Sequence, residues 1–105
     1  MVDAGCSLTD YYNGDITRTI PISGKFSKEQ KIIYEIVLSA QKTAIKSAVT
    51  GSNSSTVHNV ALTILIEGLK EIGLLTGSTE DIIKNQSYKH LYMHRTGHWL
   101  GLDVH

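Results

Sequence analysis

His94-Arg95-Thr96-Gly97-His98-Trp99-Leu100-Gly101-Leu102-Asp103-Val104-His105 closes the chain, and its three histidines follow one another at intervals of four and seven residues. Gly97 directly precedes His98, and Gly101 follows three residues later, so the backbone can bend closely around a small group. The spacing of His94 and His98 also fits one face of a helix, but a glycine between them favours a loop. We therefore expect a histidine-bearing loop followed by a strand.

Two aspartates stand at the other end of the chain, Asp3 and Asp15. Residues 11–21 are rich in β-branched and aromatic residues and Pro21 ends their strand, so a β-hairpin is expected over 1–22. A turn centred on Thr9 would place the two carboxylates opposite each other, where they repel unless a cation lies between them. Solvated residues at strand ends are the alternative. Together with His98, the aspartates form an oxygen and nitrogen donor set that suits Mn²⁺, Co²⁺ or Zn²⁺.

The middle of the chain predicts helices. Ser27-Lys28-Glu29-Gln30 is a capping-box pattern, and the helix expected over 27–49 has a repeating apolar face made of Ile33, Val37, Ala40, Ala44 and Ala48, widened by Ile32, Ile36 and Ile45. A second helix is expected from residues 54–56 to Gly73, with its buried face formed by Val57, Val60, Ala61, Ile64, Leu65, Leu69 and Ile72. A short third helix is expected over 79–85, and an extended segment over 88–93. The fold class is therefore α+β.

Composition excludes several classes of protein. The 105 residues include ten basic and ten acidic side chains, 41% hydrophobic residues and one cysteine, Cys6. No basic stripe indicates nucleic acid, and no apolar run indicates a membrane span. The chain has no signal-peptide pattern and cannot form an internal disulfide, so a cytoplasmic location is expected. At most one domain fits this length, and both ends fall within motifs, which indicates a partial domain truncated at both ends.

The end motifs, taken together, resemble a known family. Val2-Asp3-Ala4-Gly5-Cys6, Gly14-Asp15-Ile16-Thr17-Arg18-Thr19, Gly24-Lys25-Phe26 and His98-Trp99-Leu100-Gly101-Leu102-Asp103-Val104-His105 are similar to the pita-bread metallopeptidases, and among them to bacterial Xaa-Pro aminopeptidases (aminopeptidase P). The resemblance covers residues 1–105 and implies a partial pita-bread (creatinase/aminopeptidase) fold. The chain would then be part of a metallopeptidase catalytic domain.

The resemblance also implies a dinuclear metal site. Asp3 would bind one ion, Asp15 would bridge both, and His98 would bind the other, with manganese expected and cobalt or zinc as alternatives. Two further glutamate ligands of the family lie beyond His105. His105 resembles the histidine that contacts the substrate carbonyl and the tetrahedral intermediate, and His94 matches a pocket histidine near the leaving proline. The family spaces its two aspartates one residue closer, and the extra residue here inverts strand parity unless the turn or a bulge absorbs it.

The implied activity is hydrolysis of the bond between an N-terminal residue and a following proline, with a peptide carrying proline in second position as substrate. A prolidase, which cleaves Xaa-Pro dipeptides, and a non-catalytic pita-bread binding module are the alternatives. Because two ligands would be missing, we expect the 105-residue chain by itself to bind metal weakly and to be inactive. We also expect self-association into a homo-oligomer through an unfinished sheet edge.

Overall fold

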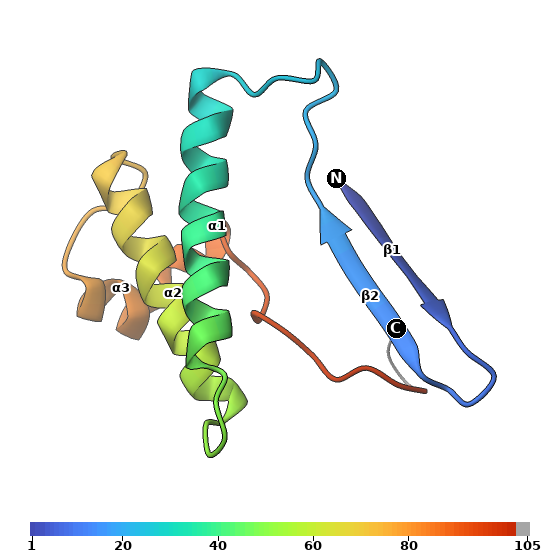
Figure 1. The fold of residues 1–105 in the computed structure, drawn as a ribbon. Coiled ribbons are helices and arrows are strands. Elements are labelled where there is room, and N and C mark those ends of the chain that lie inside the picture. Colours follow the sequence, from blue (N-terminus) through green and yellow to red (C-terminus); the bar gives the residue numbers. More distant parts are fainter. Residues whose placement is uncertain (103–105) are drawn as a thin grey trace. The chain divides into compact units, whose positions relative to one another are not determined.

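The computed structural model describes residues 1–102, which form two compact units (Figure 1). The first unit combines Met1–Lys28 with the segment that begins at His98, and it contains a β-hairpin. The second unit, Glu29–Gly97, is helical. The α+β class expected from the sequence is confirmed.

The hairpin consists of strand β1 (Val2–Ser7) and strand β2 (Asn13–Arg18), which pair antiparallel. Its register places Asp3 opposite Thr17 and Gly5 opposite Asp15, so the turn is not centred on Thr9 as the sequence suggested. Residues 8–12 form the connecting loop, closed by a hydrogen bond of 3.0 Å from the Leu8 amide to the Tyr12 carbonyl. Tyr11 adopts a left-handed backbone conformation (φ 62°), which lets the longer loop turn.

The helical unit contains helix α1 (Lys28–Ser47), helix α2 (Ser54–Glu71), helix α3 (Thr79–Asn85) and a 3₁₀ turn (Ser87–His90). The three predicted helices are confirmed to within two residues at each end. The Asn53 side chain caps α2 by accepting a hydrogen bond of 2.8 Å from the Thr56 amide, and Ser78 caps α3 in the same way. The extended segment predicted over 88–93 is wrong, because its first residues belong to the 3₁₀ turn, which follows Gln86 in a left-handed conformation.

The core of the helical unit lies between α2 and the segments that follow it. Its buried residues are Leu62, Ile66, Leu75 and Ile82, with Leu69, Tyr88 and Tyr92 packed against them. Ile66 is fully buried, although the predicted apolar face of α2 contained neither it nor Leu62. Helix α2 is covered from more than one side, so its buried surface is wider than a single stripe.

The buried face of α1 is narrower than predicted. Ala40 and Ala44 are buried as expected, but Val37 is 52% exposed and Ile45 66% exposed. Two small residues bring α1 close to its neighbour, and α1 and α2 lie side by side in Figure 1. The closest approach is at Gly68 of α2, where a Cβ atom would lie 2.6 Å from Cγ2 of Ile36.

We therefore expect Gly68→Ala to lower the free energy of unfolding by about 1–3 kcal/mol, the usual effect of inserting a methyl group into a packed contact. Guanidinium denaturation of the full-length protein measures it. Replacement of Ile36 by Ala removes the atoms that the new methyl group would meet. The stability lost through Ile36→Ala should be smaller in the Gly68→Ala protein than in the unaltered protein. Additive stability losses would show that Gly68 and Ile36 do not form this contact.

The histidine-bearing segment is a loop over its described length. Residues 94–102 contain no strand, so the strand expected after the loop is not present up to Leu102. Asp103, Val104 and His105 lie outside the described residues, and the predicted role of His105 stays a prediction.

Candidate metal centre

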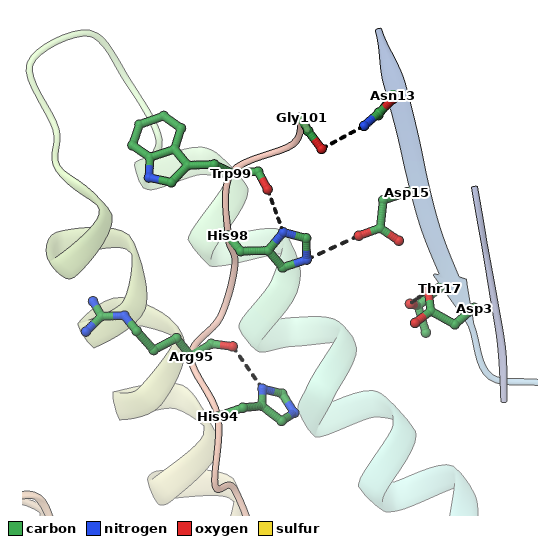
Figure 2. A network of polar contacts seen from close by, with 9 residues as sticks. All are labelled: Asp3, Asn13, Asp15, Thr17, His94, Arg95, His98, Trp99 and Gly101. Carbon is green, nitrogen blue, oxygen red and sulfur yellow. Dashed lines mark hydrogen bonds and ion pairs between the residues drawn. The ribbon is translucent and has the colours of Figure 1, made fainter. Parts of the chain in front are cut away.

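Asp15 and His98 meet within the first unit, although they stand far apart in the sequence. The Oδ2 atom of Asp15 lies 3.2 Å from Nε2 of His98, and the Asp15 side chain is 19% exposed (Figure 2). Asp15 is held by β2, whereas His98 belongs to the irregular segment after Gly97. A second contact aligns the same two segments, because Nδ2 of Asn13 donates a hydrogen bond of 3.0 Å to the Gly101 carbonyl.

The ring of His98 has an acceptor on both sides. Its Nδ1 lies 2.8 Å from the Trp99 carbonyl oxygen, which can only accept, so Nδ1 carries a hydrogen. Its Nε2 faces the Asp15 carboxylate, so an imidazole nitrogen and a carboxylate oxygen, both metal-binding donor types, lie side by side. Metal-binding histidines commonly hold their second nitrogen on a backbone carbonyl in this way.

The spacing of the donor atoms fits two ligands of a single ion. Metal–ligand bonds of about 2.0–2.2 Å at angles between 90° and the tetrahedral value separate neighbouring donor atoms by about 2.8–3.6 Å. The observed separation of 3.2 Å falls in this interval. Carboxylate oxygen and imidazole nitrogen are ligands that manganese, cobalt and zinc accept. The residues present therefore fit a divalent metal ion.

Asp3 lies on the same face of the hairpin as Asp15. It pairs with Thr17, which is two residues after Asp15, and the Thr17 hydroxyl donates a hydrogen bond of 2.7 Å to Asp3 Oδ1. The loop has thus absorbed the extra residue without inverting the parity of the strands. Asp3 is diagonal to Asp15 rather than opposite it, a separation of about 7–8 Å between such neighbours. Among residues 1–102, no three His, Cys, Asp or Glu side chains are close enough to hold one ion.

The structure thus brings Asp15 and His98 together and leaves Asp3 beside them on the same face. His94 belongs to the helical unit, where its Nδ1 contacts the Arg95 carbonyl at 2.8 Å and its ring meets that of Tyr92 edge to face. The ligand roles of Asp3, Asp15 and His98, and the substrate roles of His94 and His105, stay predictions.

Sequence reasoning missed two residues of this unit that orient others. Thr17 hydrogen-bonds Asp3, and Asn13 holds the segment that contains His98 through the Gly101 carbonyl. The Nδ2 atom of Asn13 donates to the Gly101 carbonyl, while the buried Oδ1 atom of the same amide has no hydrogen-bond partner. The register places Thr17 opposite Asp3, so a correctly placed turn would have indicated Thr17, whereas the contact of Asn13 with Gly101 lies outside the hairpin.

His58 is a third residue that the sequence motifs do not indicate, because it lies in α2, away from the motifs at the two ends of the chain. Its Nδ1 lies 2.9 Å from the Thr96 hydroxyl and accepts a hydrogen bond of 3.3 Å from the Thr96 amide. Burial, and secondly the nearby Arg95 guanidinium, lower the pKa of His58 below its usual 6.5. The neutral ring is the form that can accept the amide hydrogen bond.

This lowered pKa predicts a pH dependence of stability. The unfolded chain binds the His58 proton more tightly than the folded chain does, so the stabilising contribution is complete above about pH 6.5 and is lost as the pH falls through the lower folded pKa. Guanidinium denaturation at pH 7.5 and at pH 5 measures the loss in the full-length protein. His58→Asn keeps a hydrogen-bond acceptor at this position but has no group that binds a proton, so it should lose less stability on acidification. Equal losses in both proteins would disprove the assignment.

The chain belongs to metallopeptidase family M24, which it matches over residues 1–105. It is 48% identical over its whole length to the Xaa-Pro aminopeptidase of Haemophilus influenzae and 39% identical to that of Escherichia coli. Among solved structures, aminopeptidase PepP of Pseudomonas aeruginosa matches 98% of the chain with a TM-score of 0.90 and 46% identity. Zinc-substituted E. coli aminopeptidase P in complex with product matches with a TM-score of 0.89.

These similarities confirm the family and the partial pita-bread fold. The chain spans about a quarter of the relatives that it matches, 24% of the H. influenzae enzyme and 23% of the P. aeruginosa structure. A divalent metal ion is consistent with the metallopeptidase family and with the zinc-substituted neighbour. Within residues 1–102, every helix is too short or too polar to cross a lipid bilayer.

Proposed function

We propose that the full-length protein carrying this chain is a metal-dependent aminopeptidase that removes an N-terminal residue preceding proline. The observation that carries the proposal is the contact of 3.2 Å between Asp15 and His98, with the second nitrogen of His98 held on the Trp99 carbonyl. The similarity of the whole 105-residue chain to about a quarter of the Xaa-Pro aminopeptidases of H. influenzae and E. coli supports the choice of reaction. A peptide with proline in second position is the proposed substrate.

The metal ligands in this chain are proposed to be Asp3, Asp15 and His98, completed by residues outside the chain. The carboxylates supply negative charge that offsets the cations, and Thr17 fixes the orientation of Asp3 through its hydrogen bond. Two divalent ions are proposed, with manganese first and cobalt or zinc as alternatives. When bound, such ions polarise the scissile carbonyl and let a water molecule ionise near neutral pH.

Two histidines are proposed to act on the substrate rather than on the metal. His105 would donate a hydrogen bond to the oxygen that becomes negative as the peptide carbon turns tetrahedral. His94 would contact the substrate near the proline that leaves. The irregular backbone of residues 94–102 suits the role of His94, because binding residues are often found on loops held by a rigid scaffold.

Peptide hydrolysis by the full-length protein tests the proposal. After removal of metal and readdition of Mn²⁺, Co²⁺ or Zn²⁺, it should cleave an Xaa-Pro-Yaa tripeptide and leave the Xaa-Ala-Yaa counterpart intact. Cleavage of Xaa-Pro dipeptides alone would identify a prolidase. A protein that binds no divalent metal and cleaves neither peptide would instead be a binding module. The 105-residue chain by itself should be inactive because ligands are missing.

We further propose that the protein is a cytoplasmic homo-oligomer. The support for association is apolar surface on the hairpin unit, where Leu8 is 65% exposed, Ile20 63% and Tyr12 75%. Within the described residues the sheet has two strands, so each strand has an edge that the other does not cover. Light scattering of the purified 105-residue chain tests association through this edge, and a monomer at high concentration would contradict it.

A further inference from the structure

We propose that His58 is a positioning residue, which fixes the segment Tyr92–Gly97 by accepting hydrogen bonds from Thr96 at Nδ1. This segment carries His94 and leads directly into His98. The catalytic consequence rests on the proposed function, whereas the anchoring itself does not. His58 is neither a proposed metal ligand nor a proposed substrate contact. It acts through the backbone of the loop.

The hydrogen bonds form one directed chain. Because the Thr96 amide donates to Nδ1 of His58, this nitrogen carries no hydrogen, and the Thr96 hydroxyl at 2.9 Å must also donate to it. The Thr96 oxygen can then accept from the Tyr92 hydroxyl, which lies 3.0 Å away. Each group in this hydrogen-bond network is either a donor or an acceptor, and the network needs an unprotonated Nδ1 on His58. The loop conformation is therefore coupled to the neutral state of His58.

Contacts between aromatic rings link this hydrogen-bond network to His94. The rings of His58 and Tyr92 stack with centroids 6.1 Å apart and an angle of 21° between their planes. The ring of Tyr92 in turn meets that of His94 edge to face at 4.9 Å. Tyr92 also packs against the core of the helical unit, and Nη2 of Arg95 reaches Oγ of Ser55 on α2 at 3.4 Å. Helix α2 therefore holds the loop at His58, at Ser55 and through Tyr92.

These contacts with α2 fix the conformation of residues 91–97, which contain no helix or strand of their own. A loop without ladder hydrogen bonds keeps a binding residue in place only through side-chain contacts. A displacement of about 1 Å at a positioned group can lower a rate by about a hundredfold. The burial that lowers the pKa of His58 keeps its ring neutral at physiological pH, as the hydrogen bonds require.

Two substitutions of nearly equal size test the proposal in the metal-loaded full-length protein. His58→Asn retains a hydrogen-bond acceptor near the position of Nδ1. His58→Leu has nearly the same shape as the Asn variant but no acceptor. Gly68→Ala is the control, because it disturbs α1 and α2 without touching the loop. Hydrolysis of an Xaa-Pro-Yaa peptide, melting temperature and hydrogen exchange of residues 92–97 are measured for each protein.

We expect kcat/KM of His58→Leu to fall by about thirty- to a hundredfold, and that of His58→Asn by less than about fivefold. Gly68→Ala should lose melting temperature but keep its activity. Equal activity losses in the Leu and Asn variants, or a comparable loss in Gly68→Ala, would show that His58 supports only the general fold. If the unaltered protein cleaves no such peptide, the proposed function has failed, and hydrogen exchange decides the anchoring alone. Residues 92–97 should then exchange faster only in His58→Leu, and unchanged exchange would overturn the proposal.

Discussion

Asp15→Asn should abolish most of the peptidase activity proposed for the full-length protein and weaken the proposed metal binding. The amide keeps the shape of the side chain and can donate to Nε2 of His98, so the contact of 3.2 Å can persist without the negative charge. Metal-ion stabilisation of transition-state charge is worth several kcal/mol, and a loss of about 4 kcal/mol lowers kcat/KM by about a thousandfold. Activity on Xaa-Pro-Yaa peptides and metal content by mass spectrometry provide the two measurements.

Asp10→Asn is the matched control, because it removes the same charge from the exposed loop of the same hairpin. It should change neither metal content nor activity. If Asp15→Asn retained its metal and its rate, Asp15 could not be a ligand, and the contact with His98 would be an ordinary ion pair. The melting temperature of each variant separates loss of the site from loss of the fold.

Gly5→Ala should disrupt the hairpin beside the proposed metal centre. Gly5 faces Asp15 across the two strands, and a Cβ atom at Gly5 would fall on the carbonyl oxygen of Gly14. The obstacle is backbone, so a rotamer change cannot relieve it, and β2 must move together with Asp15. We expect a loss of about 3 kcal/mol in stability or more, at the upper end for overpacking, and a strong loss of metal binding.

Gly14→Ala tests the specificity of this effect in the facing strand. A Cβ atom at Gly14 would meet only the Sγ atom of Cys6, at 4.0 Å, and should be tolerated. Chemical denaturation and metal titration of both variants give the comparison. Similar behaviour of the two proteins would mean that the hairpin relaxes freely and that the register does not fix the position of Asp15.

The helices and the hairpin could be predicted because local patterns determine them. The capping-box pattern at Ser27 and the apolar periodicity mark helix boundaries that the structure keeps to within two residues, whereas β2 ends at Arg18, three residues before Pro21. The register could not be predicted, since the loop of residues 8–12 depends on a left-handed Tyr11 that no residue pattern indicates. The buried faces of the helices were also partly wrong, because tertiary contacts rather than periodicity decide which side of α2 is covered.

For the site, the residue types were predictable but their supporting contacts were not. The motifs around Asp15 and His98 indicated ligands, and the structure brings these two side chains together. His58 stands forty residues before His98 in the sequence and has no glycine or acidic neighbour that indicates a role. Its contact with Thr96 is a product of packing between α2 and a distant loop, which a single sequence does not reveal.

The contacts between β2 and the loop after Gly97 affect how the chain folds. Asn13 and Gly101 are 88 positions apart, so their contact closes one of the longest loops that this chain can make. Long-range closure is slow compared with helix formation, and the hairpin and the helices should form before the loop closes. A metal ion that bound residues of both segments would bind the folded chain and not the unfolded one, so it would stabilise the closed loop by mass action, by about 2.7 kcal/mol at a free-ion concentration about a hundred times its dissociation constant. Chelators should therefore lower the melting temperature of the full-length protein as well as stop its chemistry.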